Sequence, residues 1–266
     1  MRTEEIDSQR GSGEQSQLGS YSPSTPVDYF GEEVAARYDE DEAAMFAPAA
    51  IEPAVEFLAA LAAGRPALEL GIGTGRIALP LRARGVAVHG IDLSTAMVER
   101  LRAKPGGAAI PVVIGDFATA AGGGEFGLVY LVFNTIGNVA SQAEQVSCFR
   151  NVARHLAPGG HFVIEVAVPG ILGLPPGETV RAFEVTDDHV GVDEYDVVTQ
   201  ALISHHFYRD RDGWRRSFTP LRYVWPSELD LMAQLAGLTL VERWGDWDRS
   251  PYDRTSSKHV SVWRRE

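Results

Sequence analysis

Residues 67–85 read ALELGIGTGRIALPLRARG, and this stretch constrains the fold more than any other part of the chain. An apolar run ends in three glycines at alternate positions, Gly71, Gly73 and Gly75, and the pattern then becomes helical. This succession is typical of a strand, a tight turn and a helix in a doubly wound α/β sheet. A turn without side chains presents free backbone N–H groups, so a ligand can lie directly on the main chain. The sequence therefore predicts a ligand site at these glycines.

Short apolar runs alternate with helical segments after this turn. Their continuous hydrophobicity is typical of parallel strands that helices cover on both faces. With right-handed crossovers, the pattern predicts a doubly wound α/β fold, preceded by lead-in helices over residues 28–63. The predicted strands after the turn read VAVHGID, IPVVIGD, FGLVYLVFN and HFVIEVAV. Ser94 and Ser141 are predicted to cap two of the helices between them, and Ser141 forms a capping box with Glu144.

The period of the apolar residues changes to two after the last of these runs. We therefore predict an antiparallel insertion over about residues 171–226. A helix and a closing pair of strands follow it, so that residues 28–266 form a single domain. Three segments carry the alternation, namely TVRAFEV, DVVTQALISHHFYRD and WRRSFTPLRYVW.

Composition excludes several classes of protein. The formal net charge is −12, which disfavours a nucleic acid partner. No apolar run approaches the roughly 20 residues of a membrane helix. Residues 1–27 are rich in Ser, Gly, Gln and Pro and lack a signal peptide pattern, so we predict a disordered tail and a cytoplasmic protein. The single cysteine, Cys148, agrees with a reducing compartment, and no Asp/His cluster has metal-ligand spacing.

The spacing of the glycines distinguishes two kinds of ligand. In a dinucleotide fingerprint the third glycine would fall at position 76, which is Arg76 here. The pattern is instead E-x-G-x-G-x-G, with Glu69 before the turn. A carboxylate there would repel a diphosphate and attract an ammonium group. A nicotinamide-dependent oxidoreductase therefore remains only as an alternative.

The segment LELGIGTGR resembles the first motif of the class I S-adenosylmethionine-dependent methyltransferases. HGIDLSTAMVERLRAK, VVIGDFAT and LAPGGHFVIEV extend the resemblance over residues 65–170. It implies a mostly parallel, seven-stranded, Rossmann-like sheet with the insertion as a lid, and S-adenosylmethionine as cofactor. Asp92 then holds the ribose hydroxyls, while Asp116 and Phe117 lie beside the adenine. A carboxylate suits the first role because it can accept both hydroxyl hydrogens of a ribose.

The resemblance implies further cofactor contacts, namely Tyr29, Tyr38, Leu93, Met97 and Phe133. Each has a plainer alternative: Met97, four residues before Leu101, fits core packing, and the tyrosines fit the surface of a lead-in helix. Asn134, at the end of the fourth strand, is predicted to contact the acceptor or to serve only as a turn residue.

The insertion supplies the remaining candidates. His205 and His206 are adjacent on a strand and face opposite sides, so we expect at most one to border the acceptor as a base, and the pattern does not decide which. Tyr223 and Trp225 are candidate walls for the acceptor, or members of the core of the lid. The expected activity is methyl transfer to a nitrogen, oxygen or carbon of a small molecule of the secondary-metabolite type. The alternative is a protein that binds the cofactor without catalysis.

Overall fold

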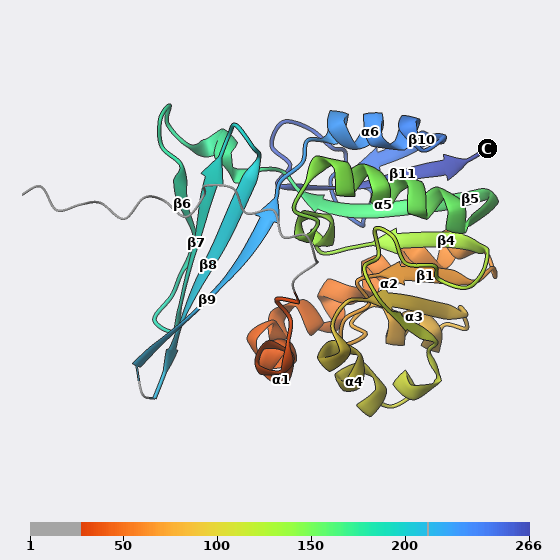
Figure 1. Cartoon of the computed structure of the whole chain (residues 1–266), viewed down its shortest axis with the longest axis horizontal. Coiled ribbons are helices and arrows are strands. Elements are labelled where there is room, and N and C mark those ends of the chain that lie inside the picture. The colour runs from red at the N-terminus through yellow and green to blue at the C-terminus, as the bar shows by residue number, and fades with distance from the viewer. Residues whose placement is uncertain (1–27, 212) are drawn as a thin grey trace, which may run out of the picture.

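A computed structural model describes residues 28–211 and 213–266, so the predicted tail, residues 1–27, lies outside the described residues. The chain forms a seven-stranded sheet and a separate four-stranded sheet, which stands to one side of it in Figure 1. Among the described helices, none is both long and apolar enough to cross a membrane.

The larger sheet confirms the predicted doubly wound fold. Its order is β10-β11-β5-β4-β1-β2-β3, so the glycine turn follows a strand near the middle of the sheet. Five neighbouring strands are parallel, and β11 runs antiparallel to both β5 and β10. The strands are β1 (Ala67–Leu70), β2 (Val88–Asp92), β3 (Val112–Ile114), β4 (Phe126–Leu131), β5 (Leu156–Ala167), β10 (Leu238–Trp244) and β11 (Lys258–Arg265).

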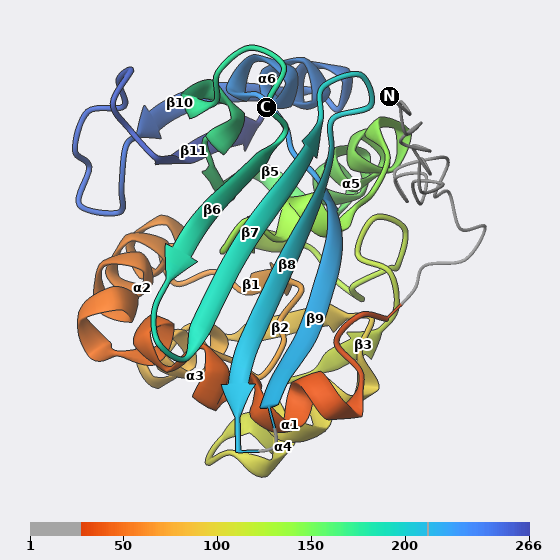
Figure 2. The ribbon, with the colours of Figure 1, turned by 90° about the vertical axis from the view of Figure 1, so that its left-hand side faces the viewer.

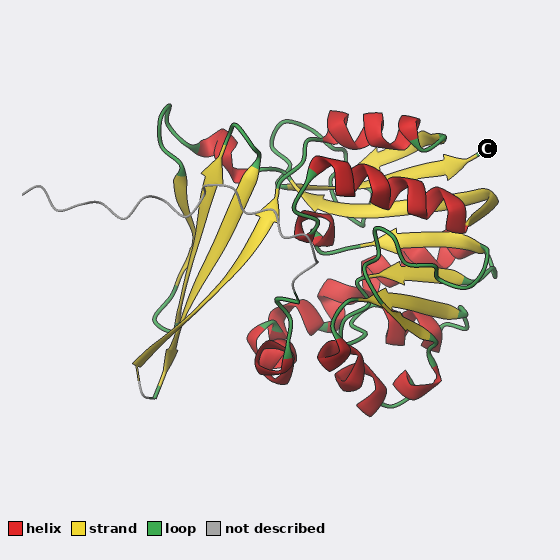
Figure 3. Ribbon diagram, viewed as in Figure 1, coloured by secondary structure: helices red, strands yellow, loops and turns green. Residues whose placement is uncertain are grey.

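Helices cover both faces of this sheet, as Figure 3 shows. Because successive side chains of a strand point to opposite faces, Leu68 packs with the helices of one face and Ala67 with those of the other. The first face carries α5 (Gln142–His155) and α6 (Pro226–Leu235), and the second carries α2 (Pro48–Ala62), α3 (Ala78–Ala83) and α4 (Thr95–Ala103). The remaining helices are α1 (Glu32–Asp41) and four 3-10 turns, η1 (Ala43–Phe46), η2 (Gly107–Ala109), η3 (Thr135–Asn138) and η4 (Gly170–Gly173).

The smaller sheet is the predicted antiparallel insertion, but it has four strands where the sequence suggested three segments. The predicted segments correspond to the first, third and fourth strands. The prediction missed the second strand, residues 189–196, because its Gly and Asp residues lie between the first two segments, where they indicated a turn. Figure 2 shows the four strands side by side across the front of the molecule. They are β6 (Val180–Val185), β7 (His189–Asp196), β8 (Ala201–Asp210) and β9 (Gly213–Arg222), paired in that order.

The smaller sheet stands beyond the carboxyl ends of the parallel strands, which is the edge where ligands bind in open α/β sheets. Two predicted helix caps are confirmed at this edge. The Ser94 Oγ accepts the Met97 N–H at the start of α4, and the Ser141 Oγ accepts the Glu144 N–H at the start of α5. The helices therefore begin next to the strand ends and bring their first turns to the same edge.

Candidate active site

Two adjoining cavities lie at the carboxyl edge of the larger sheet. The glycine-turn cavity, of about 190 Å³, lies against the turn after β1. The inter-sheet cavity, of about 630 Å³, lies between this edge and the smaller sheet. Phe30, Tyr38, Thr135 and Asn138 line both cavities. A molecule in one cavity can therefore reach a molecule in the other.

The three glycines have two different roles. Gly71 and Gly73 line the glycine-turn cavity with φ of +69° and +54°, a conformation that L side chains rarely adopt. A Cβ at Gly71 would also lie 2.7 Å from the Thr135 Cγ2. Gly75 lies outside both cavities, and a Cβ there would lie 2.3 Å from the Leu101 Cδ1. The first two glycines leave room for a ligand, and the third allows α4 to pack closely.

Asp92, at the end of β2, holds the turn in place. Its Oδ2 accepts the Gly73 N–H at 2.6 Å, and its Oδ1 accepts the Ser94 N–H at 2.8 Å. Burial raises the pKa of this carboxyl group, and the two backbone hydrogen bonds oppose that shift. Each carboxylate oxygen keeps a further lone pair, so Asp92 can also accept hydroxyl hydrogens from a ligand.

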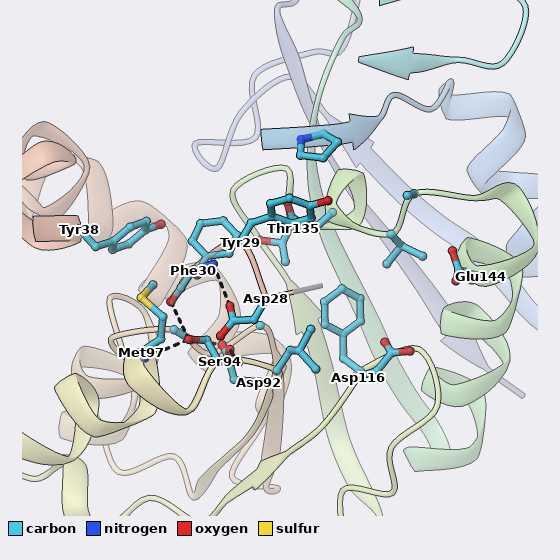
Figure 4. A pocket seen from close by; sticks show the side chains of 18 of the residues that line it. Asp28, Tyr29, Phe30, Tyr38, Asp92, Ser94, Met97, Asp116, Thr135 and Glu144 are labelled. Atoms are coloured by element: carbon cyan, nitrogen blue, oxygen red, sulfur yellow. Dashed lines mark hydrogen bonds between the residues drawn. The ribbon is translucent and has the colours of Figure 1, made fainter. Parts of the chain in front are cut away.

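The segment before α1 closes over the glycine-turn cavity, as Figure 4 shows. The Ser94 hydroxyl donates to the Phe30 carbonyl oxygen at 2.7 Å, and the Phe30 N–H donates to the Asp28 carboxylate at 2.8 Å. Tyr38, on α1, points toward the same space and has its pKa raised to about 12, mainly by burial. These contacts fix the N-terminal segment to the start of α4.

Most of the cofactor contacts predicted from the sequence come together in the glycine-turn cavity. The predicted residues that line it are Tyr29, Tyr38, Gly71, Gly73, Asp92, Leu93, Met97, Asp116 and Phe117. The sequence did not single out Asp28 or Thr135, which also line it, nor did it give Ser94 and Ser141 any role except helix capping. Each of the two serines caps a helix that begins near a strand end, and this position could have identified both as residues of the cavity wall.

Glu69 and Phe133 lie elsewhere. Glu69 is outside both cavities, since it shares a face of the sheet with Tyr130, its neighbour on β4, and accepts the Tyr130 O–H at 2.8 Å. Burial raises the pKa of Glu69 to about 8. The carboxyl group therefore supports the strand beneath the turn and does not line the space above it. Phe133 lines only the inter-sheet cavity, with the Arg76 guanidinium 4.8 Å from its ring centroid.

Only some of the predicted acceptor residues line the inter-sheet cavity. Asn134 and Tyr223 line it, and the Asn134 side chain also accepts the Ala167 N–H at 3.3 Å. Trp225 is outside it, because Trp225 directly precedes α6 and packs its ring edge against Tyr223 at 6.0 Å. Trp225 therefore supports the wall that Tyr223 forms.

The two histidines of β8 point in opposite directions, as the alternation of a strand requires. His206 lines the inter-sheet cavity, whereas the His205 ring nitrogens lie near Glu194 and Arg216 outside it. Burial, with a contribution from His189, lowers the pKa of His206 to about 4. His206 is therefore neutral at neutral pH, with one ring nitrogen able to accept a proton.

The inter-sheet cavity is rich in carboxylates. Its acidic residues are Asp41, Glu42, Glu165, Glu184 and Asp193, and its Lys and Arg residues are Arg181 and Lys258. Lys258 is engaged by Glu165 at 3.1 Å and by Asp246 at 2.8 Å. In the part of the chain that the structure describes, no hydrogen bond or ion pair engages the Glu42 carboxylate. In the sequence, Glu42 looked the same as the other acids of YDEDEA, so it was not predicted.

A family model described as a methyltransferase domain matches residues 67–160. The solved CcbJ methyltransferase from Streptomyces caelestis is 39% identical, covers 89% of this chain and 98% of its own, and superposes with a TM-score of 0.78. The cypemycin N-terminal methyltransferase of a Streptomyces species is 27% identical over 76% of this chain and 84% of its own.

A third relative, the dTDP-4-amino-2,3,4,6-tetradeoxy-D-glucose N,N-dimethyltransferase of Saccharopolyspora spinosa, is 35% identical over 37% of this chain and 39% of its own. The high identity to the solved methyltransferase along almost its whole length agrees with the match of the family model and with the glycine turn, Asp92 and the doubly wound sheet. The chain therefore belongs to the class I S-adenosylmethionine-dependent methyltransferases.

Proposed function

We propose that this enzyme transfers a methyl group from S-adenosylmethionine to an amine nitrogen of a small molecule. The observation that carries the proposal is the partly buried Glu42 carboxylate, which lines the inter-sheet cavity next to Tyr38. Burial and the adjacent Asp41 raise the pKa of Glu42. An incoming ammonium group would relieve both effects by giving the carboxylate a partner.

The proposal places the cofactor in the glycine-turn cavity. Asp92 fits the ribose hydroxyls and Asp116 fits the adenine amino group, while Gly71 and Gly73 leave room along the backbone. The cofactor supplies a methyl group that its sulfonium already activates. The protein then has to align the acceptor, exclude water and keep the acceptor nitrogen neutral. Tyr38, which lines both cavities, is the proposed boundary between donor and acceptor.

The names of two relatives support a nitrogen acceptor. One acts on the N-terminus of cypemycin, and the other dimethylates the nitrogen of an amino sugar nucleotide. The excess of carboxylates over free cations in the inter-sheet cavity agrees with a positively charged acceptor. We therefore place amino sugars and small amine-bearing peptides first among acceptor classes.

The test is a panel of matched acceptors in which an amine is replaced by a hydroxyl group on the same skeleton. Purified protein is incubated with S-adenosylmethionine and each pair, and products are followed by the mass of one added methyl group and by formation of S-adenosylhomocysteine. Methylation of the amines alone is the expected result. Methylation of the hydroxyl compounds with the amines untouched would overturn the choice of nitrogen.

A further inference from the structure

Four side chains on three adjacent strands of the smaller sheet form a continuous hydrogen-bonded series. The Glu184 Oε2 on β6 lies 2.8 Å from the His189 Nδ1 on β7. The His189 Nε2 lies 3.0 Å from the His206 Nδ1 on β8. The His206 Nε2 then lies 3.3 Å from the Ser204 Oγ. The series crosses the sheet along the surface that lines the inter-sheet cavity.

The packing of the sheet keeps the two imidazoles in line. Their planes differ by only 10°, and their centroids are 5.1 Å apart, so the His189 Nε2 and the His206 Nδ1 lie within hydrogen-bond distance of each other. Gly191 lies opposite His206 in the register of β7 and β8. A Cβ at Gly191 would lie 2.2 Å from the Phe183 ring, which itself packs edge-on against His206 at 5.4 Å. The glycine therefore makes room for the ring that holds His206 in position.

The hydrogen bonds set the resting protonation of the series. A carboxylate can only accept, so the His189 Nδ1 carries a hydrogen toward Glu184 and the His189 Nε2 is left as an acceptor. The His206 Nδ1 then carries a hydrogen toward His189, with the Tyr208 hydroxyl oxygen as a second acceptor at 3.3 Å, and the His206 Nε2 keeps a free lone pair near Ser204. The low pKa of His206, about 4, agrees with this neutral state. The end of the series at the cavity thus presents an unprotonated ring nitrogen.

The other end of the series reaches a second space. An outer hollow of about 300 Å³ shares Asp41, Glu184, His189 and Tyr208 with the inter-sheet cavity. The Glu184 side chain is 52% exposed, so its carboxylate can exchange protons with water. The series therefore joins the buried cavity to the surface.

Resting on the proposed amine acceptor, we propose that Ser204, His206, His189 and Glu184 form a proton relay that carries the acceptor's proton from the inter-sheet cavity to solvent. An N–H bond of the acceptor ammonium breaks, and its electron pair stays on the nitrogen. The proton reaches the His206 Nε2, directly or through the Ser204 hydroxyl. The hydrogen of the His206 Nδ1 passes to His189, that of the His189 Nδ1 passes to Glu184, and Glu184 releases a proton to water. Rotation of the rings resets the series.

Several charged and titratable groups face the relay and contribute to its pH dependence. From α1 and its end come Asp41 and Glu42, from β8 Tyr208, from β7 Asp193, and from β9 Arg215. None of them is changed in the variants below, and His205, which faces away from the cavity, serves as the matched control.

The first measurement needs no acceptor. Nitrogen NMR of the histidine rings at neutral pH should place the His206 hydrogen on Nδ1 in the wild type. The substitution Glu184→Gln should lower that population, because an amide no longer fixes the tautomer of His189. A His206 that carries its hydrogen on Nε2, or that is unaffected by Glu184→Gln, would overturn the relay whatever the acceptor proves to be.

The second measurement separates a relay from a structural role. With an amine acceptor, His189→Gln should lower kcat/KM at least tenfold at pH values where the acceptor is an ammonium ion. The loss should disappear as the pH rises past the pKa of the acceptor, because the amine then arrives neutral. His205→Gln should match the wild type. A loss of equal size at every pH would show a packing role only. A wild type that methylates no amine would count against the proposed function, and the NMR result would still decide the relay.

Discussion

The Ser94 hydroxyl donates a hydrogen bond to the Phe30 carbonyl oxygen at 2.7 Å, while its oxygen accepts the Met97 N–H at 3.3 Å. One side chain therefore caps α4 and fastens the segment that closes the glycine-turn cavity. Replacement of Ser94 by Ala should lower the free energy of unfolding by about 1 kcal/mol, the usual cost of a lost cap. It should also weaken the binding of S-adenosylmethionine, because the segment is released. Calorimetric titration and thermal unfolding would measure both effects.

The control for Ser94→Ala is Thr95→Ala, an exposed change one residue further along the same helix. It should leave the affinity for the cofactor unchanged. Equal affinities in Ser94→Ala and the wild type would show that the contact with Phe30 does not contribute to closure of the cavity.

Removal of the Asp92 carboxylate should weaken cofactor binding by about 1 to 3 kcal/mol, the scale of a lost charge-assisted hydrogen bond. Asp92→Asn is the sharper variant. Its amide has a single oxygen, which can accept only one of the two N–H groups of Gly73 and Ser94, and its NH2 group cannot accept the remaining one. Titration of S-adenosylhomocysteine into Asp92→Asn and into the exposed control Glu99→Gln gives the difference. If Asp92→Asn binds as the wild type does, the ribose is held by other residues.

The third glycine of the turn should matter for stability. In Gly75→Ala the new Cβ would lie 2.3 Å from Leu101, and φ of +84° is unfavourable for alanine. Gly85 has a φ of +86°, but nothing lies within 4 Å of its Cβ position. Gly85→Ala should therefore cost about 1 kcal/mol, from the backbone alone. Denaturant unfolding should show a further loss of about 1 to 3 kcal/mol in Gly75→Ala, from overpacking. Equal losses in the two variants would mean that α4 shifts without cost.

Glu42→Gln should raise KM for an amine acceptor about tenfold, which corresponds to about 1.4 kcal/mol. The affinity for S-adenosylmethionine should not change, because Glu42 lines only the inter-sheet cavity. Glu40→Gln, an exposed change on α1, is the matched control. Steady-state kinetics with both substrates varied would separate the two effects. A KM that does not change in Glu42→Gln would remove Glu42 from the acceptor site.

His259 makes stability depend on pH. Its side chain is fully buried, and burial, with a contribution from Arg243, lowers its pKa from about 6.5 to about 4. Between these values the unfolded chain binds a proton that the folded chain does not. Stability is therefore complete above pH 6.5 and falls as the pH decreases toward 4. The full loss from this residue is about 3 kcal/mol.

The variant His259→Asn should make this decline shallower without abolishing it, because His206 has its pKa lowered in the same direction. Denaturant unfolding of both proteins at several pH values would measure the slopes. Parallel curves for the variant and the wild type would show that His259 is not the group that titrates.

The larger sheet and much of the site could be predicted from the sequence, because the patterns that indicate them lie within short stretches of the chain. Continuous apolar runs predict buried parallel strands, and a glycine turn after the first of them fixes where Gly71 and Gly73 lie. Asp92 and Asp116 each follow a strand directly, so the edge they share follows from the order of the elements. Ser94 and Ser141 were identified as caps by the same short-range logic.

The inter-sheet cavity depends on how two sheets are placed, and no local pattern encodes that placement. His205 and His206 were equal candidates at the level of sequence, because alternation along a strand separates two faces without indicating which one lines a cavity. Pairing with β7 on the cavity side brought His206 to His189 and Glu184, residues 17 and 22 positions away in the chain. The same long-range placement left Glu42 partly buried, with no hydrogen bond or ion pair to its carboxylate from residues 28–211 and 213–266. Local chemistry thus determined the fold and the cofactor edge of this protein, whereas the acceptor side was decided only when the second sheet packed over the first.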